Sequence, residues 1–77
     1  MEEDKIKQII NAMNAGRDDI VVVAAAQAFF NPDMSTNNKA VKEFEEFTGL
    51  KVYISDSKIA GFKSGWIIYK GEKFYFS

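Results

Sequence analysis

The chain has 77 residues with a formal net charge of −1, and 47% of its residues are hydrophobic. This composition is typical of one folded domain, here residues 1–77, and the near-neutral charge argues against a general binder of polyanions. The sequence contains neither histidine nor cysteine, which excludes disulfides, thiolate metal sites and histidine-dependent catalysis. The acidic N-terminus has no apolar segment behind it, so we expect no secretory signal and a cytoplasmic location.

Charges and aromatic side chains divide the chain near residue 50. Residues 1–50 carry a net charge of −4, and residues 51–77 carry a net charge of +3. Seven of the eleven aromatic residues also lie after residue 50. We therefore expect an acidic first part and a basic, aromatic second part.

Residues 4–15 are predicted to form an amphipathic helix. Its apolar residues follow the i, i+3, i+4, i+7 spacing of a single helix face; they are Ile6, Ile9, Ile10 and Met13. Gly16 is well placed to end this helix, because glycine adopts the left-handed conformation without a steric penalty.

The segment from Ile20 to Phe30 is expected to form the centre of the core. Gln27 is its only polar residue. The segment therefore shows neither the polar stripe of a surface helix nor the alternation of a half-exposed strand, so it must be covered on most sides. It is too short to cross a bilayer, which takes about 20 residues.

Two interpretations of this segment stay open, of which we favour the first. The first is a buried helix at 19–30, with Asp18 or Asp19 as its cap and Pro32 preventing its continuation. The alanines at 24–26 and 28 favour it. The second is a short strand at 20–23 leading into a helix, because four β-branched residues in succession favour a strand.

A third helix is predicted at about 37–48. Its apolar stripe comprises Ala40, Val41, Phe44 and Phe47. Thr36 or Asn37 is expected to cap its first turn, and Gly49 is expected to end it. The helix also carries three acidic residues that we expect to form an exposed face: Glu43, Glu45 and Glu46.

After residue 49 the hydrophobic period changes to two, which predicts strands at about 50–55, 66–70 and 73–77. The expected fold is therefore α+β, with three N-terminal helices packed on a small antiparallel sheet. In the first strand, one face is expected to hold Leu50, Val52 and Ile54, and the opposite face Lys51, Tyr53 and Ser55.

The last two strands are predicted to form a hairpin around Gly71-Glu72, with glycine at the first central position of the turn. One face of the hairpin then lies on the helices and holds Ile67, Tyr69, Phe74 and Phe76. The other face points outward and holds Trp66, Ile68, Lys70, Lys73 and Tyr75. A one-residue slip in register would exchange the two faces.

The outward hairpin face is the strongest candidate for a binding site. Tryptophan and tyrosine often dominate the energetics of protein interfaces, and aromatic side chains flanked by lysines also suit nucleic-acid bases and phosphates. The alternative is that the loop at 56–65 covers this face, with Phe62 packed on Trp66.

Candidate catalytic groups do not occur in the patterns that their chemistry needs. Asp18 and Asp19 are better explained as a helix cap than as paired catalytic carboxylates. The glycine-bracketed segment Gly61–Gly65 lacks the spacing of a phosphate-binding loop and precedes a strand rather than a helix. We therefore expect no catalytic residue, no cofactor and no enzymatic activity.

A calcium site is also excluded by spacing. The segment from Asp33 to Asn37 places oxygen ligands at alternate positions, as a calcium loop does. However, Asn38 stands where the loop needs glycine, and Phe44 stands where it needs a bidentate glutamate. We expect no metal site.

The leading functional hypothesis is a small non-catalytic module that binds another protein through the outward hairpin face or the acidic helix face. In composition alone it is similar to small inhibitor and accessory proteins carried by phages and mobile elements. One alternative is a nucleic-acid-binding domain of winged-helix type, since three helices precede a hairpin; acidic residues on the third helix count against it. The other is a self-associating structural subunit, because the apolar central segment needs extensive cover.

Overall fold

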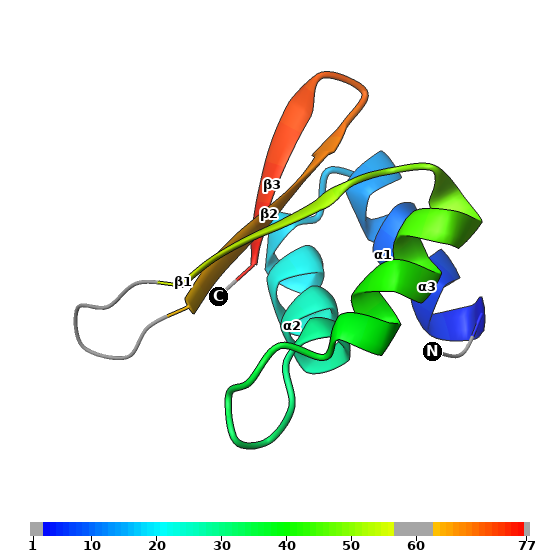
Figure 1. The fold of residues 1–77 in the computed structure, drawn as a ribbon. Helices are drawn as coiled ribbons and strands as arrows, with labels where there is room; N and C mark the ends of the chain where they lie inside the picture. The colour runs from blue at the N-terminus through cyan, green and yellow to red at the C-terminus, as the bar shows by residue number, and fades with distance from the viewer. Residues whose placement is uncertain (1–2, 57–62, 77) are drawn as a thin grey trace.

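The computed structural model describes residues 3–56 and 63–76, and its helices lie to one side of its sheet (Figure 1). The elements, in chain order, are α1 (Glu3–Asn14), α2 (Asp18–Phe29), α3 (Asn38–Thr48), β1 (Val52–Asp56), β2 (Lys63–Tyr69) and β3 (Glu72–Phe76). The sheet is antiparallel with the strand order β1-β2-β3. The predicted α+β architecture, with three helices before a three-stranded sheet, is confirmed.

The central segment is helical from its first turn, so the strand at 20–23 is not formed. In Figure 1, α2 lies between β3 and the other two helices, and it contacts α1, α3 and β3. Val21, Ala25 and Phe29 on its inner side are fully buried. Contacts with three elements explain why the β-branched residues stay helical, because tertiary packing overrides the propensity of a single segment. Within the described parts of the chain, no helix is both long and apolar enough to span a membrane.

The predicted cap of α2 is wrong. The helix begins at Asp18, its N-cap is Arg17, and no side chain accepts a capping hydrogen bond. Asp18 and Asp19 instead lie in the first turn, where the helix dipole favours negative charge. The predicted end is confirmed, because Phe30 adopts an extended conformation two residues before Pro32.

The ends of the other two helices agree with their predicted signals. Gly16 and Gly49 have φ values of 66° and 73° after α1 and α3, the left-handed conformation that favours glycine. The side chain of Asn37 caps α3 by accepting from the Ala40 N–H at 3.2 Å. A bridge between Phe30 and Thr36 closes the loop between α2 and α3.

The core is built around aromatic rings from three elements. Phe29 of α2 packs edge-on against Phe44 of α3, with 5.2 Å between ring centroids. It also packs against Phe76 of β3 at 5.3 Å, and all three rings are fully buried. Phe47 does not join them, contrary to the predicted stripe of α3, because its side chain is 54% exposed.

The predicted turn of the hairpin is wrong by one residue. β2 and β3 are joined by Lys70-Gly71 rather than by Gly71-Glu72. Both turn residues have positive φ, 52° and 78°, as in a type I′ turn, whose twist matches that of the flanking strands. This turn was not predicted, because it requires a positive φ at Lys70, which is uncommon for a non-glycine residue.

The predicted faces of the hairpin are correct despite this shift. Ile67 pairs with Phe74, and Trp66 pairs with Tyr75. A turn at Gly71-Glu72 would instead have paired Ile67 with Phe76, two residues further along β3. Because strand side chains alternate with a period of two, a shift of two leaves every residue on the same face. The inner-face residues Ile67 and Phe74 are buried, as predicted.

Replacing Gly71 by alanine is expected to destabilise the protein by about 1 kcal/mol, because a Cβ disfavours the left-handed conformation. Apart from atoms of Gly71 and its two chain neighbours, no heavy atom lies within 4 Å of the Cβ that the substitution adds, so the cost comes from the backbone conformation. Urea unfolding measures it. A stability equal to that of the wild type would show that the turn does not hold this conformation.

Candidate functional site

The outer face of the sheet carries a row of three aromatic side chains, one from each strand. The strand registers pair Tyr53 with Trp66 and Trp66 with Tyr75. The next row on this face contains Ile68, which pairs with Lys73. Extending the β1–β2 register by one residue places Lys51 on the other side of Ile68. We call these six residues the aromatic–lysine face: Lys51, Tyr53, Trp66, Ile68, Lys73 and Tyr75.

The aromatic rings of this face contact one another. The Tyr53 and Trp66 rings are nearly parallel, with centroids 5.5 Å apart and an angle of 6° between their planes. Tyr75 is tilted by 52° from Trp66, with centroids 6.4 Å apart. Packed rings of this kind lose little side-chain freedom when a partner covers them, so they form a preorganised contact surface.

The two lysines of the face lie over these rings. The Nζ atom of Lys73 is 4.7 Å from the Trp66 centroid and 5.0 Å from the Tyr75 centroid. The Nζ atom of Lys51 is 5.3 Å from the Tyr53 centroid. Each contact is within cation–π range. The two ammonium groups therefore lie close to the aromatic row, although both lysines are exposed to solvent.

The face presents large apolar side chains to solvent. Tyr75 is 58% exposed and Ile68 is 45% exposed, while Tyr53 and Trp66 are half-buried. The helices cover the opposite side of the sheet, where Val52, Ile67 and other core residues are buried. The predicted packing of Phe62 on Trp66 lies outside the described residues.

Lys70 does not belong to this face, contrary to the prediction. Its Nζ donates to Asn14 Oδ1 at 3.2 Å, at the end of α1. The same oxygen accepts from the Tyr69 hydroxyl at 2.8 Å. Because the turn lies one residue earlier than expected, Lys70 is a turn residue that anchors the hairpin to α1.

Lys51 and Tyr53 belong to this face but were not predicted as site residues. Their alternation with Val52 was visible, so their outward direction was predictable. What the sequence did not show is that β1 pairs with β2 in a register that brings Tyr53 beside Trp66. Pairing between strands far apart along the chain has no local signature, unlike the turn of a hairpin.

The three glutamates of α3 do not form one solvent-exposed face. Successive residues of a helix are about 100° apart, so Glu45 lies on a different side of the helix from Glu43. Glu45 is half-buried and its Oε2 accepts from the Val52 N–H at 2.9 Å, which ties α3 to the start of β1. Glu43 is also half-buried, and Glu46 is exposed. The predicted acidic face is therefore dispersed.

Replacing Glu45 by alanine is expected to lower the free energy of unfolding by about 1–2 kcal/mol, because the Val52 N–H loses a charge-assisted acceptor. Glu46→Ala is the matched control, since this exposed side chain is expected to change stability by less than about 0.5 kcal/mol. Urea unfolding of the two variants compares them. Equal effects would show that the bond to Val52 contributes nothing.

Among residues 3–56 and 63–76, no group of three or more acidic side chains is placed to hold a metal ion. The aromatic–lysine face offers apolar area and positive charge, but none of its six residues is acidic.

Comparisons with protein-family models, with curated proteins and with solved structures find no match to this chain.

Proposed function

We propose that this chain is a non-catalytic binding module that recognises an acidic segment of another protein through the aromatic–lysine face. The observation that carries the proposal is the continuous row Tyr53–Trp66–Tyr75 across all three strands, with lysines held over its rings. The residues that contribute most to binding in protein interfaces are often aromatic, and a polar or charged border surrounds them.

The positive charge favours an acidic partner. Lys73 lies on β3 and Lys51 directly precedes β1, so the two lysines flank Ile68. An extended segment crossing the sheet would place an apolar side chain on Ile68 and carboxylates near the lysines. Complementary charge raises the association rate and selects among partners. Such a module acts by occupying a surface of its partner, as small inhibitor or accessory proteins do.

The geometry of Trp66 favours a protein partner over single-stranded nucleic acid. Base recognition on a sheet needs an open ring face on which the base stacks. Tyr53 lies parallel to the Trp66 ring from the β1 side, and Lys73 lies over it from the β3 side. A base would have to displace one of them. Glu43 and Glu46 on α3 also disfavour phosphate contacts by a winged-helix mode.

Selection from a displayed library of random linear peptides tests the proposal. The wild-type chain is the bait, and a Trp66→Ala/Tyr75→Ala variant is the counter-selection bait. We expect peptides that combine Asp or Glu with large apolar residues, and that bind the wild type more tightly than the variant. Selected peptides that bind both baits equally would contradict the site.

A labelled oligothymidylate provides the nucleic-acid arm of the test. We expect no measurable binding at moderate salt and at most weak binding at low salt, since two lysines release few counterions. Tight binding that is lost in the Trp66→Ala/Tyr75→Ala variant would assign the face to nucleic acid instead.

A further inference from the structure

The outer edge of β3 carries backbone groups that pair with nothing in the sheet. β3 is an edge strand (Figure 1). Tyr69 and Glu72 flank the two-residue turn, so they form a hydrogen-bonded pair, and such pairs alternate along an antiparallel ladder. Phe74 is therefore bonded to β2, whereas Lys73 and Tyr75 direct their N–H and C=O groups away from it. No other described segment makes a hydrogen bond to the backbone of these two residues.

The opposite edge of the sheet follows the same alternation and is closed at its start. The β1–β2 register places the N–H of Val52 on the outer side of β1, and Glu45 Oε2 accepts from it at 2.9 Å. A side chain of α3 therefore occupies the first position of that edge. An open edge strand is a template for pairing with another chain, and β3 is the more accessible of the two edges.

The side chains of β3 do not cover its edge. The Nζ atom of Lys73 lies 4.7 Å from the centroid of the Trp66 ring, so the lysine leans across the sheet toward β2. The Tyr75 ring also contacts Trp66, with centroids 6.4 Å apart. Both Lys73 and Tyr75 are exposed. A strand that approaches β3 from outside therefore meets its backbone.

We propose that an extended acidic segment of the partner protein pairs with β3 as a fourth strand of the sheet. This inference rests on the proposed function, which supplies the acidic partner, and adds a second contact to it. A partner chain that crosses the aromatic–lysine face leaves that face over β3, so one partner can make both contacts. In strand addition the backbone hydrogen bonds provide affinity and the alternate side chains provide specificity.

The charge of Lys73 selects the occupant of this edge. Neighbouring strands are about 4.8 Å apart, so a carboxylate opposite Lys73 on the added strand forms a favourable cross-strand pair. A lysine on an edge strand disfavours pairing with a second copy of the chain. Because side chains alternate, the residue two positions away on the added strand lies beside Tyr75. The segment is therefore expected to carry an acidic and a large apolar residue two positions apart.

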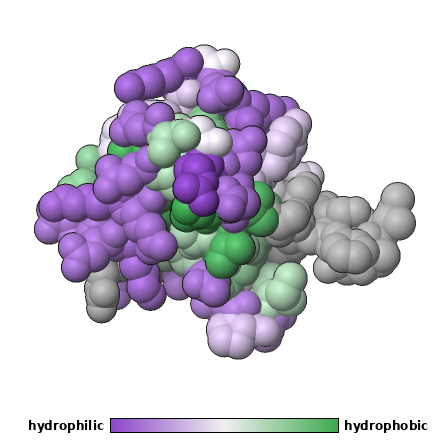
Figure 2. Space-filling view, turned by 180° about the vertical axis from the view of Figure 1, so that it is seen from behind, coloured by the Kyte–Doolittle hydropathy of each residue, from purple (hydrophilic) through white to green (hydrophobic). Residues whose placement is uncertain are grey.

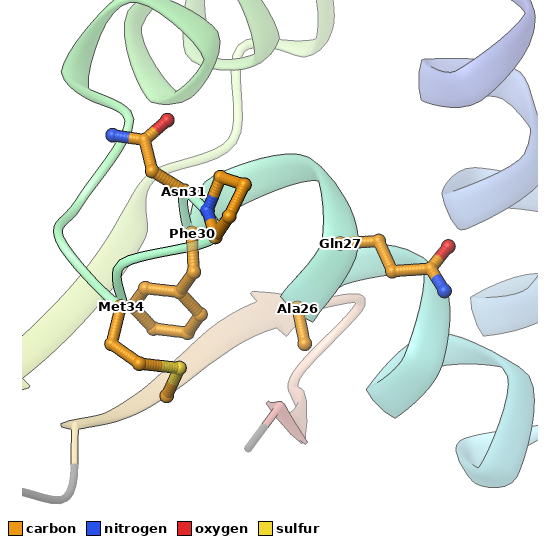
Figure 3. Close-up of a pocket in the computed structure, with 6 residues that line it drawn as sticks. Ala26, Gln27, Phe30, Asn31 and Met34 are labelled. Atoms are coloured by element: carbon orange, nitrogen blue, oxygen red, sulfur yellow. The ribbon is translucent and has the colours of Figure 1, made fainter.

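The main alternative docking surface is apolar and lies elsewhere. In the view from behind, strongly hydrophobic residues reach the surface near the middle of the molecule, with hydrophilic residues beside them (Figure 2). A groove of about 400 Å³ lies at the C-terminal end of α2, and Figure 3 shows its Phe30 ring and Met34 side chain next to each other. None of the residues that line the groove is charged, so it offers no cation to an acidic segment. Charge therefore favours the edge of β3.

Amide hydrogen exchange, measured by NMR with and without a selected acidic peptide, tests the pairing. In the free chain we expect the Lys73 and Tyr75 amides to exchange at least ten times faster than the Phe74 amide, which is bonded to β2. At saturation with the peptide, we expect exchange at Lys73 and Tyr75 to slow at least tenfold. Unchanged exchange at both amides in the saturated complex would overturn the pairing.

The same measurement separates this inference from the proposed function. If the peptide needs the rings of Trp66 and Tyr75 but leaves the two amides unprotected, the face binds the peptide and the edge does not. If the peptide binds the Trp66→Ala/Tyr75→Ala variant as tightly as the wild type, the proposed function fails. Exchange at the amides of residues 73 and 75 still decides the pairing in that variant, because both substitutions keep the backbone N–H.

A matched pair of variants removes one edge N–H at constant charge. Lys73→Pro and Lys73→Ala both lack the ammonium group, but only proline also lacks the N–H. Because this N–H faces away from β2, proline removes no hydrogen bond of the sheet. We expect Lys73→Pro to bind the peptide at least ten times more weakly than Lys73→Ala. Equal affinities of the two folded variants would overturn the proposal.

Methylation of single backbone nitrogens in the peptide gives the same test without a change in the protein. We expect losses of affinity of at least tenfold at every second position of the paired segment, where the peptide N–H donates to β3. Methylation at the positions between them should change affinity less than twofold. A peptide that tolerates methylation at every position would contradict strand pairing.

Discussion

Replacing Trp66 by alanine is expected to weaken the binding of a selected acidic peptide by about 30-fold or more, a loss of about 2 kcal/mol. Trp66 lies on the middle strand and contacts both Tyr53 and Tyr75. Its removal separates these rings and deprives Lys73 of its closest aromatic partner. The substitution thus affects the aromatic area and the placement of a charge together. Isothermal titration with the same peptide measures the loss.

Two control variants separate a binding role from a structural one. Trp66→Phe keeps an aromatic ring in the row, so we expect a smaller loss of affinity than in Trp66→Ala. Tyr69→Phe alters the inner side of the same strand, where it removes only the exposed hydrogen bond to Asn14, and should bind as the wild type does. If Tyr69→Phe lost as much affinity as Trp66→Ala, binding would not depend on the outer face.

Replacing Phe76 by alanine is expected to destabilise the fold by about 3–5 kcal/mol, because the ring is fully buried and its loss leaves a cavity. Phe76 joins β3 to α2 through its contacts with Phe29 and Phe30. A chain of this length has a total stability of about 4–12 kcal/mol, so this one substitution is expected to remove between about a quarter and all of it. Urea unfolding measures the change. Phe47→Ala, on an exposed side chain, should cost less than about 1 kcal/mol.

Gly65 provides an independent check on the position of the Phe76 ring. A methyl group at Gly65 would overlap this ring and lie 3.0 Å from the Tyr53 carbonyl oxygen. Gly65→Ala should therefore cost about 1–3 kcal/mol in the wild type. In a Phe76→Leu background, which lacks the ring, we expect it to cost less. Equal costs in the two backgrounds would show that Phe76 does not lie over Gly65.

Local signals predicted most of the fold. The spacing of Ile6, Ile9 and Met13 located α1, and the glycines at 16 and 49 marked helix ends. The helical state of residues 20–23 was left open, because a fully apolar segment has no period to distinguish helix from strand. Contacts of α2 with α1, α3 and β3 decided it.

The candidate site was predicted only in part, and the missing part depends on tertiary structure. The alternation of side chains identified which residues of the hairpin point outward. The predicted turn was wrong by one residue, but this error shifts the strand pairing by two residues and therefore leaves every side chain on its predicted face. Residues 57–62 separate β1 from β2 along the chain, so no local sequence signal indicated that Tyr53 lies beside Trp66. Lys70 was misplaced for a local reason, since positive φ at lysine is uncommon.

The central claim is that the aromatic–lysine face is the binding surface, and mapping of amide and indole chemical shifts during titration with a selected acidic peptide tests it most directly. Trp66 is the only tryptophan, so its indole N–H gives an unambiguous signal at the centre of the site. We predict the largest shift changes at Tyr53, Trp66 and Tyr75, with α1 and α3 unchanged. Largest changes on the helices, with the Trp66 indole signal unmoved at saturation, would contradict the proposed function.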